Sequence, residues 1–231
     1  MRIRLVLLIM MVLCASASVA AYGEGGLPLS MDDQVSVTIS SAPFLAAKFK
    51  DRRLNRGIIY YEHPKLQLPK MRRMTMAISS VTVRVALDEL LRGDTTYSWV
   101  ADGNVAVFIP RIKINGLLDP TKTLSQIMPR FDVTDSNIVD AVEELKRQAA
   151  KQGLTGLPKP TKGWIPVSKM SPYTYDWQFS LHLKNKSIRE CLDAIVEGDP
   201  PATWIAIPFP GYVFIAVSAS NPHMGRLRRK P

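Results

Sequence analysis

The chain carries one short stretch of sequence twice. Residues 83–99 are VRVALDELLRGDTTYSW and residues 188–204 are IRECLDAIVEGDPPATW, at a constant offset of 105 positions and without a gap. The identical pairs are Arg84/Arg189, Leu87/Leu192, Asp88/Asp193, Gly93/Gly198, Asp94/Asp199 and Trp99/Trp204. We interpret the repeat as a duplicated fold unit, not as a catalytic motif, and the fold prediction is built outward from it.

Both copies have the pattern of an amphipathic helix. Apolar residues occur at i, i+3, i+4, i+7 and i+8: Val83, Ala86, Leu87, Leu90 and Leu91 in the first copy, and Ile188, Cys191, Leu192, Ile195 and Val196 in the second. Thr82 and Ser187 precede the helices as N-caps, and Ser187 forms a capping box with Glu190. Gly93 and Gly198 are expected to end the helices in the left-handed conformation.

Segments with period-two patterns predict strands on both sides of each helix. These segments are residues 74–78 and 179–183 before the helices, 97–100 and 105–109 after the first, and 203–207 and 212–217 after the second. Turns are expected at Asp102-Gly103 and Pro210-Gly211. Each unit is therefore a strand, a helix and a hairpin, and its helix needs a sheet on which to bury its apolar stripe.

The upstream segments complete the two units. Residues 131–133 predict a short strand, after which Asp135 or Ser136 caps a helix that ends at Gly153. Residues 35–54 begin as a strand and continue as an interrupted helix. The predicted fold class is α+β: two small tandem modules, each with helices packed on a short mixed β-sheet.

The N-terminus has the order of a secretory signal. A basic start, an apolar run at residues 5–13 and small residues at 15–21 predict a signal peptide over residues 1–21, with cleavage after Ala17, Ala20 or Ala21. An uncleaved anchor and lipidation at Cys14 are the alternatives, although Leu13 is larger than a lipidation site prefers. We expect an exported protein, periplasmic or associated with the outer membrane.

The charge balance favours anionic partners. The net charge is +10, and removal of Arg2 and Arg4 with the signal lowers it to +8. Such an excess suits lipid headgroups or cell-wall polymers, whereas an exported protein rarely meets nucleic acid, so no nucleic-acid partner is expected. Once Cys14 is removed, Cys191 is the only cysteine, and no internal disulfide can form.

No catalytic or metal-binding constellation is evident in the sequence. His63, His182 and His223 have no metal-like spacing to other ligands, and Cys191 lies on the apolar stripe as a small core residue. We therefore predict no catalytic residue, no metal and no cofactor. Asp88 and Asp193 are expected to be solvated, because each lies on the polar side of its helix. Trp99 and Trp204 are expected to pack in the cores.

The candidate binding residues lie in an insertion and in the C-terminal tail. Residues 154–177, LTGLPKPTKGWIPVSKMSPYTYDW, combine aromatic and basic side chains in an irregular segment, as interfaces do. The partner-binding candidates are Trp164, Tyr173, Tyr175, Trp177, Lys159, Lys162 and Lys169. The alternative is an ordered loop whose aromatic residues pack on its own module. In the tail, residues 218–231, the anion-binding candidates are Arg226, Arg228, Arg229 and Lys230.

The chain resembles the short N-terminal module shared by secretins and TonB-dependent receptors. The resemblance rests on Phe131-Asp132-Val133, Ile138, Ala141-Val142 and Leu145, on Leu87-Asp88, Leu90-Leu91 and Gly93, and on Leu192-Asp193, Gly198 and residues 213–215. It implies two tandem modules, residues 35–110 and 131–217, joined by a linker at 111–130. In that family the module usually precedes an outer-membrane barrel or ring domain, whereas here a basic tail follows.

The resemblance implies a periplasmic contact module. We therefore expect a non-catalytic protein–protein interaction module of the cell envelope, an adaptor or assembly factor. Its partner would be a secretin, a TonB-dependent receptor or an inner-membrane regulator. The alternative is a binder of anionic envelope polymer or lipid that uses the basic clusters and the tail. An enzyme would require polar groups from both modules to converge.

Overall fold

The computed structural model describes residues 30–39, 54–61, 76–92, 97–111, 113–159, 173–174, 178–198, 202–219 and 228–229. Its elements, in chain order, are β1 (Gln34–Ile39), β2 (Asn55–Ile59), β3 (Met76–Thr82), α3 (Val83–Leu91), β4 (Tyr97–Asp102), β5 (Val105–Pro110), α4 (Pro120–Leu124), β6 (Ile127–Ser136), α5 (Ile138–Lys151), β7 (Tyr173–Thr174), β8 (Phe179–Ser187), α7 (Ile188–Gly198), β9 (Ala202–Phe209), β10 (Tyr212–Ala219) and β11 (Arg228–Arg229). The α+β class is confirmed.

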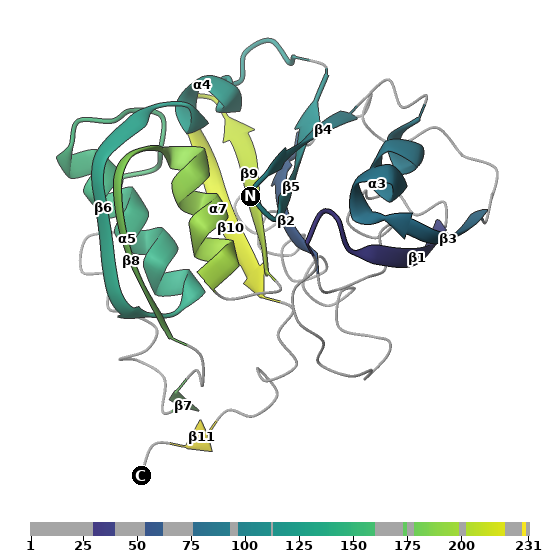
Figure 1. Ribbon diagram of the computed structural model, residues 1–231. Coiled ribbons are helices and arrows are strands. Elements are labelled where there is room, and N and C mark those ends of the chain that lie inside the picture. Colours follow the sequence, from purple (N-terminus) through teal and green to yellow (C-terminus); the bar gives the residue numbers. More distant parts are fainter. Residues whose placement is uncertain are drawn as a thin grey trace.

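One five-stranded sheet joins the hairpins of the two repeats (Figure 1). Its order is β10-β9-β2-β5-β4, with each hairpin antiparallel and β2 parallel to both β5 and β9. The sequence predicted a sheet for each module and missed β2. All five residues of β2 are buried, so the strand lacks the alternation that marks a half-exposed strand.

The helices cover opposite faces of this central sheet. Successive residues of β5 alternate between two apolar clusters: Val105 and Val107 belong to the larger cluster, Ala106 and Phe108 to the smaller one. In β2, Ile59 faces the larger cluster and Ile58 the smaller. Because side chains of a strand alternate between faces, strands of the first half contribute to the core of the second.

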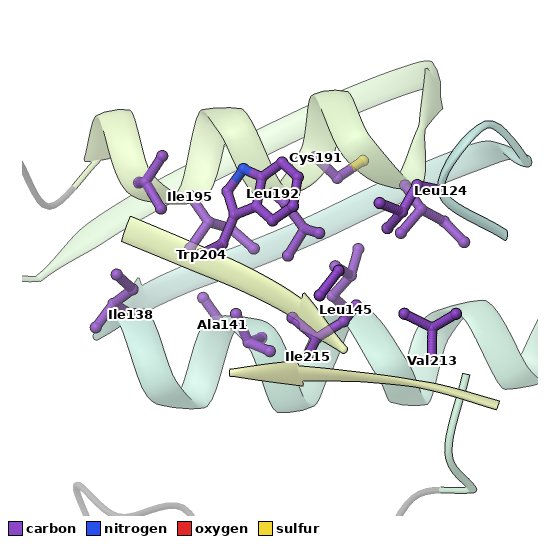
Figure 2. Close-up of a cluster of buried hydrophobic side chains, with 14 of the residues drawn as sticks. Leu124, Ile138, Ala141, Leu145, Cys191, Leu192, Ile195, Trp204, Val213 and Ile215 are labelled. Carbon is purple, nitrogen blue, oxygen red and sulfur yellow. The ribbon is translucent and has the colours of Figure 1, made fainter. Parts of the chain in front are cut away.

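The larger cluster is built around α5 and α7. These helices pack between the antiparallel pair β6–β8 and the central sheet (Figure 1). Figure 2 shows Trp204 lying against α7, close to Leu192, while Leu145 of α5 faces Val213 and Ile215 of β10. The smaller cluster lies under α3, which contacts β4 and the antiparallel pair β1–β3.

The predicted N-caps of α3 and α7 are confirmed, and the predicted N-cap of α5 was wrong. Thr82 Oγ1 accepts the N–H of Val85 at 3.3 Å, so it caps α3 as predicted. The cap of α5 is Asn137, whose Oδ1 accepts two backbone N–H groups at 2.9 and 3.0 Å. The prediction of Asp135 or Ser136 was wrong because β6 continues to Ser136, so the helix begins one residue later.

Two glycines close helices for different reasons. Gly153 has φ +74°, and its N–H and that of Leu154 donate to the carbonyl oxygens of Ala150 and Ala149, which is the expected left-handed helix end. Gly198 does not adopt the left-handed conformation that we predicted. It is the last residue of α7, and a Cβ atom there would lie 2.9 Å from the ring of Phe179, so close packing requires the glycine. Gly93 lies outside the described residues.

The capping box at the start of α7 yields a prediction of pH-dependent stability. Glu190 accepts hydrogen bonds from Lys186 Nζ at 2.8 Å and from the Ser187 N–H at 2.7 Å, which lower its pKa to about 2 from 4.5. A carboxyl whose pKa is lowered by folding stabilises the protein above its unfolded value. This contribution is lost as the pH falls from about 4.5 to about 2.

We expect Glu190→Gln to lower the free energy of unfolding by about 1 kcal/mol at pH 7, a value reduced by the solvent exposure of the side chain. Urea unfolding of both proteins at pH 7 and at low pH measures this difference. It should nearly vanish near pH 2. A difference that stays constant with pH would contradict the role of the charged carboxylate.

Candidate partner-binding sheet edge

The structure describes only part of the two predicted binding segments. Lys159 is exposed, Tyr173 lies in β7, and Arg228 and Arg229 form β11. Outside the described residues lie Trp164, Tyr175, Trp177, Lys162, Lys169, Arg226 and Lys230. Strands β7 and β11 pair antiparallel, with Tyr173 opposite Arg229 (Figure 1). The pairing brings two residues of the insertion, Tyr173 and Thr174, next to the basic tail.

The repeated aspartate and tryptophan are hydrogen-bonded to each other in both copies. Trp99 Nε1 donates to Asp88 Oδ1 at 2.9 Å, and Trp204 Nε1 donates to Asp193 Oδ1 at 2.6 Å. Each bond joins a repeat helix to the strand that follows it. The helical pattern and the strand pattern of the sequence do not by themselves link the two residues. Their identical spacing of 11 residues was the signal that could have paired them.

The two pairs differ sharply in burial. Trp204 is fully buried and Asp193 is 4% exposed, whereas Asp88 is exposed and Trp99 is half-buried. The prediction that Trp204 packs in the core and that Asp88 is solvated is therefore confirmed. The prediction that Asp193 is solvated was wrong, because its carboxyl is hydrogen-bonded to the buried Trp204 and lies next to the Arg189–Asp102 ion pair.

Burial raises the pKa of Asp193 to about 8 from 3.8. The Trp204 hydrogen bond and the Arg189 guanidinium act against this rise, while the Asp102 carboxylate adds to it. Arg189 Nε is 3.9 Å from Asp193 Oδ2, but Arg189 Nη2 is only 2.9 Å from Asp102 Oδ2. Because the guanidinium lies closer to Asp102, it offsets only part of the rise that burial causes in the pKa of Asp193.

The same cluster connects the two halves of the protein. The turn between β4 and β5 contacts α7 through the Asp102–Arg189 ion pair and through the Asn104 N–H, which donates to Glu197 Oε1 at 3.1 Å. Asp193 lies beneath this contact, where its burial leaves no access for a substrate. We assign the cluster to the connection between the two halves of the fold.

Cys191 and His182, the cysteine and the histidine of the described residues, have side chains of kinds that can take part in catalysis or bind a metal. Cys191 is fully buried, and burial raises the pKa of its thiol to about 12, which confirms it as a small core residue. His182 is exposed, and its Nδ1 lies 3.0 Å from Asp132 Oδ1. In the described ranges, no three histidine, cysteine or carboxylate side chains are grouped as a metal site would need. His63 and His223 lie outside these ranges.

Strand β4 lies at one edge of the central sheet, and its outer side pairs with no other strand of the described residues. In a two-residue hairpin the closing pair, here Asp102 and Val105, exchanges hydrogen bonds. Alternation along the strand then directs the N–H and C=O groups of Trp99 and Ala101 away from β5. Val100 is 40% exposed. A hollow of about 230 Å³ adjoins this edge and is lined by Asp88, Leu91, Ser98, Trp99 and Arg111.

The opposite edge of the sheet is partly covered. The Val213 N–H of β10 donates to the Gly156 carbonyl at 2.6 Å, so the loop after α5 contacts the start of this strand. Among the described residues, no such backbone hydrogen bond covers the outer edge at Trp99 and Ala101. The edge of β4 is therefore the candidate site.

Comparison with protein-family models, with curated proteins and with solved structures found no match to this chain. The resemblance to the secretin and TonB-receptor module therefore stays a prediction. Within the described part of the chain, no helix is long and apolar enough to cross a membrane.

Proposed function

We propose that this protein is a non-catalytic interaction module of the cell envelope, an adaptor or assembly factor that binds another envelope protein. The observation that carries the proposal is the outer edge of β4, where Trp99 and Ala101 direct backbone groups away from the sheet and no strand of the described part of the chain pairs with them. An unpaired edge can accept a strand from another chain, which gives small sheets a general binding mode.

The surroundings of this edge support a binding role. Trp99 is half-buried beside the exposed Asp88, so the edge combines an apolar ring with hydrogen-bonding groups. Interfaces are enriched in such aromatic anchors. The signal predicted over residues 1–21 and the family resemblance support a partner in the envelope. A secretin, a TonB-dependent receptor or an inner-membrane regulator is the proposed class of partner.

Capture from crosslinked envelopes tests this proposal. The tagged protein is purified from crosslinked cells at low and high salt, and bound proteins and the mass of the mature chain are determined by mass spectrometry. We expect one near-stoichiometric envelope protein that is retained at high salt, and a chain that lacks residues 1–17, 1–20 or 1–21. Recovery of the protein from the cytoplasm with its N-terminus intact would contradict the proposal.

A second candidate function is binding of anionic polymer or lipid. The observation that favours it is the pairing of β11, which contains Arg228 and Arg229, with Tyr173–Thr174 of the insertion. Charge-driven binding is screened by salt, so it should be released at high ionic strength. Replacement of Arg226, Arg228, Arg229 and Lys230 by alanine should abolish it, whereas capture of a protein partner by the β4 edge should be unchanged.

A further inference from the structure

In the second repeat, a further strand pairs with the edge that corresponds to the outer edge of β4 in the first repeat. Strand β9 follows α7 as β4 follows α3, and Trp204 is the counterpart of Trp99. Strand β2 runs parallel along β9, with Gly57 opposite Trp204 and Ile59 opposite Ala206. In addition, the Tyr60 N–H donates to the Ala206 carbonyl at 2.8 Å.

Strand β2 has two features that suit this position. Gly57 lies directly on the indole of Trp204, because a Cβ atom there would be only 2.2 Å from Trp204 Cζ2. Asn55 Oδ1 accepts the Ala202 N–H at 3.0 Å and satisfies a backbone donor at the end of the edge. A strand that covers this edge therefore needs a very small residue over the tryptophan and aliphatic residues after it.

The edge of β4 presents the same arrangement without a covering strand among the described residues. Trp99 and Ala101 correspond to Trp204 and Ala206, and the hairpin register directs their backbone groups outward in the same way. Trp204, which β2 covers, is fully buried, whereas Trp99 is half-buried.

We propose that the edge of β4 binds an extended segment of another protein, parallel to β4, with glycine facing Trp99 and aliphatic residues following it. The inference rests on the proposed function and specifies its binding mode. Strand β2 of this chain is not the occupant, because it already pairs with β5 on one side and β9 on the other. A second copy could donate its β2 only by opening its own central sheet.

A peptide that copies β2 provides the probe. It contains residues 54–61, LNRGIIYY, followed by two lysines for solubility, and is added to the full-length mature protein. Amide exchange measured by NMR reports on the outward N–H groups of Trp99 and Ala101. We expect saturating peptide to slow exchange at both amides at least tenfold. The same peptide with Gly57→Val should produce no slowing, since its side chain collides with the indole.

Two protein variants test the specificity of this binding. Ala101→Pro removes one outward N–H but no β4–β5 hydrogen bond, and proline is tolerated on edge strands, so we expect about tenfold weaker binding with unchanged Trp204 protection. Trp99→Leu shortens the side chain under the peptide and should restore binding of the Gly57→Val peptide. Equal binding of both peptides to the wild type would overturn the proposal.

The free protein supplies a further test. If exchange at Trp99 and Ala101 is already slow in the monomer, a segment of this chain covers the edge and the proposal fails. Protection that increases with protein concentration would identify a second copy as the occupant, which overturns it as well. Rapid exchange at both amides that does not depend on concentration is the supporting result.

Capture in cells separates this inference from the proposed function. We expect Ala101→Pro to lose the envelope partner that the wild type retains at high salt. If Ala101→Pro still captures that partner, the binding mode is wrong and the adaptor function stands. If the wild type captures no envelope protein at all, the proposed function fails, and the inference that depends on it fails too.

Discussion

Gly57→Ala is expected to lower the free energy of unfolding by about 3 kcal/mol, at the upper end of the cost of overpacking a core. The new Cβ atom would lie 2.2 Å from Cζ2 and 2.3 Å from Cε2 of Trp204. The indole cannot move aside easily, because it is fully buried and its Nε1 is hydrogen-bonded to Asp193. Urea or guanidinium unfolding of the purified variant measures the loss.

A double-mutant cycle with Trp204→Leu provides the control. Trp204→Leu alone should cost about 3 kcal/mol, because it leaves a cavity between α7 and the sheet. In its presence the alanine at position 57 has room, so Gly57→Ala should cost less than about 1 kcal/mol. Additive losses in the double variant would show that Gly57 is needed for another reason than contact with Trp204.

Asp193→Asn is expected to stabilise the protein, and the gain should grow with pH. Folding raises the pKa of this carboxyl to about 8 from 3.8, so the folded state holds a proton that the unfolded state releases. The contribution of this carboxyl to stability is therefore fully present below about pH 4 and is lost as the pH rises to about 8. Asparagine keeps an acceptor for Trp204 and a donor at the second position, as the neutral carboxyl does.

At pH 7 the expected gain is on the order of a few kcal/mol, since each pKa unit corresponds to about 1.4 kcal/mol. It should become small near pH 4. Unfolding curves of both proteins between pH 4 and pH 9 test this dependence. Asp88→Asn is the matched control, because the equivalent aspartate is exposed, and its effect should stay within about 0.5 kcal/mol. A destabilised Asp193→Asn at pH 7 would show that the buried carboxyl is ionised.

The expected effects of Gly57→Ala and Asp193→Asn both depend on β2, a strand that the sequence pattern did not predict. Strand β2 covers Trp204, to which Asp193 is hydrogen-bonded, and at the same time joins the two hairpins into one sheet. The two halves should therefore unfold together. Strand β2 does not pair with β4, and the outer edge of β4 is where we propose that a partner strand binds.

Local patterns in the sequence were sufficient for the repeated elements. The apolar periodicity of α3 and α7, the caps Thr82 and Ser187, and the two hairpin turns depend on residues within a few positions of one another. Such signals act through backbone geometry and nearby side chains, so they can be recognised without knowledge of the fold. The α+β class follows from them.

The shared sheet and the unequal burial of the two aspartates required the folded chain. Asp88 and Asp193 have the same local pattern, a leucine before them and a tryptophan 11 residues after. Two contacts between distant segments separate them: β2 covers Trp204, the partner of Asp193, and the Asp102–Arg189 ion pair lies over Asp193 itself. A fully buried strand has no periodic pattern to mark it, and the glycine that fits Trp204 has meaning only once the two strands are adjacent.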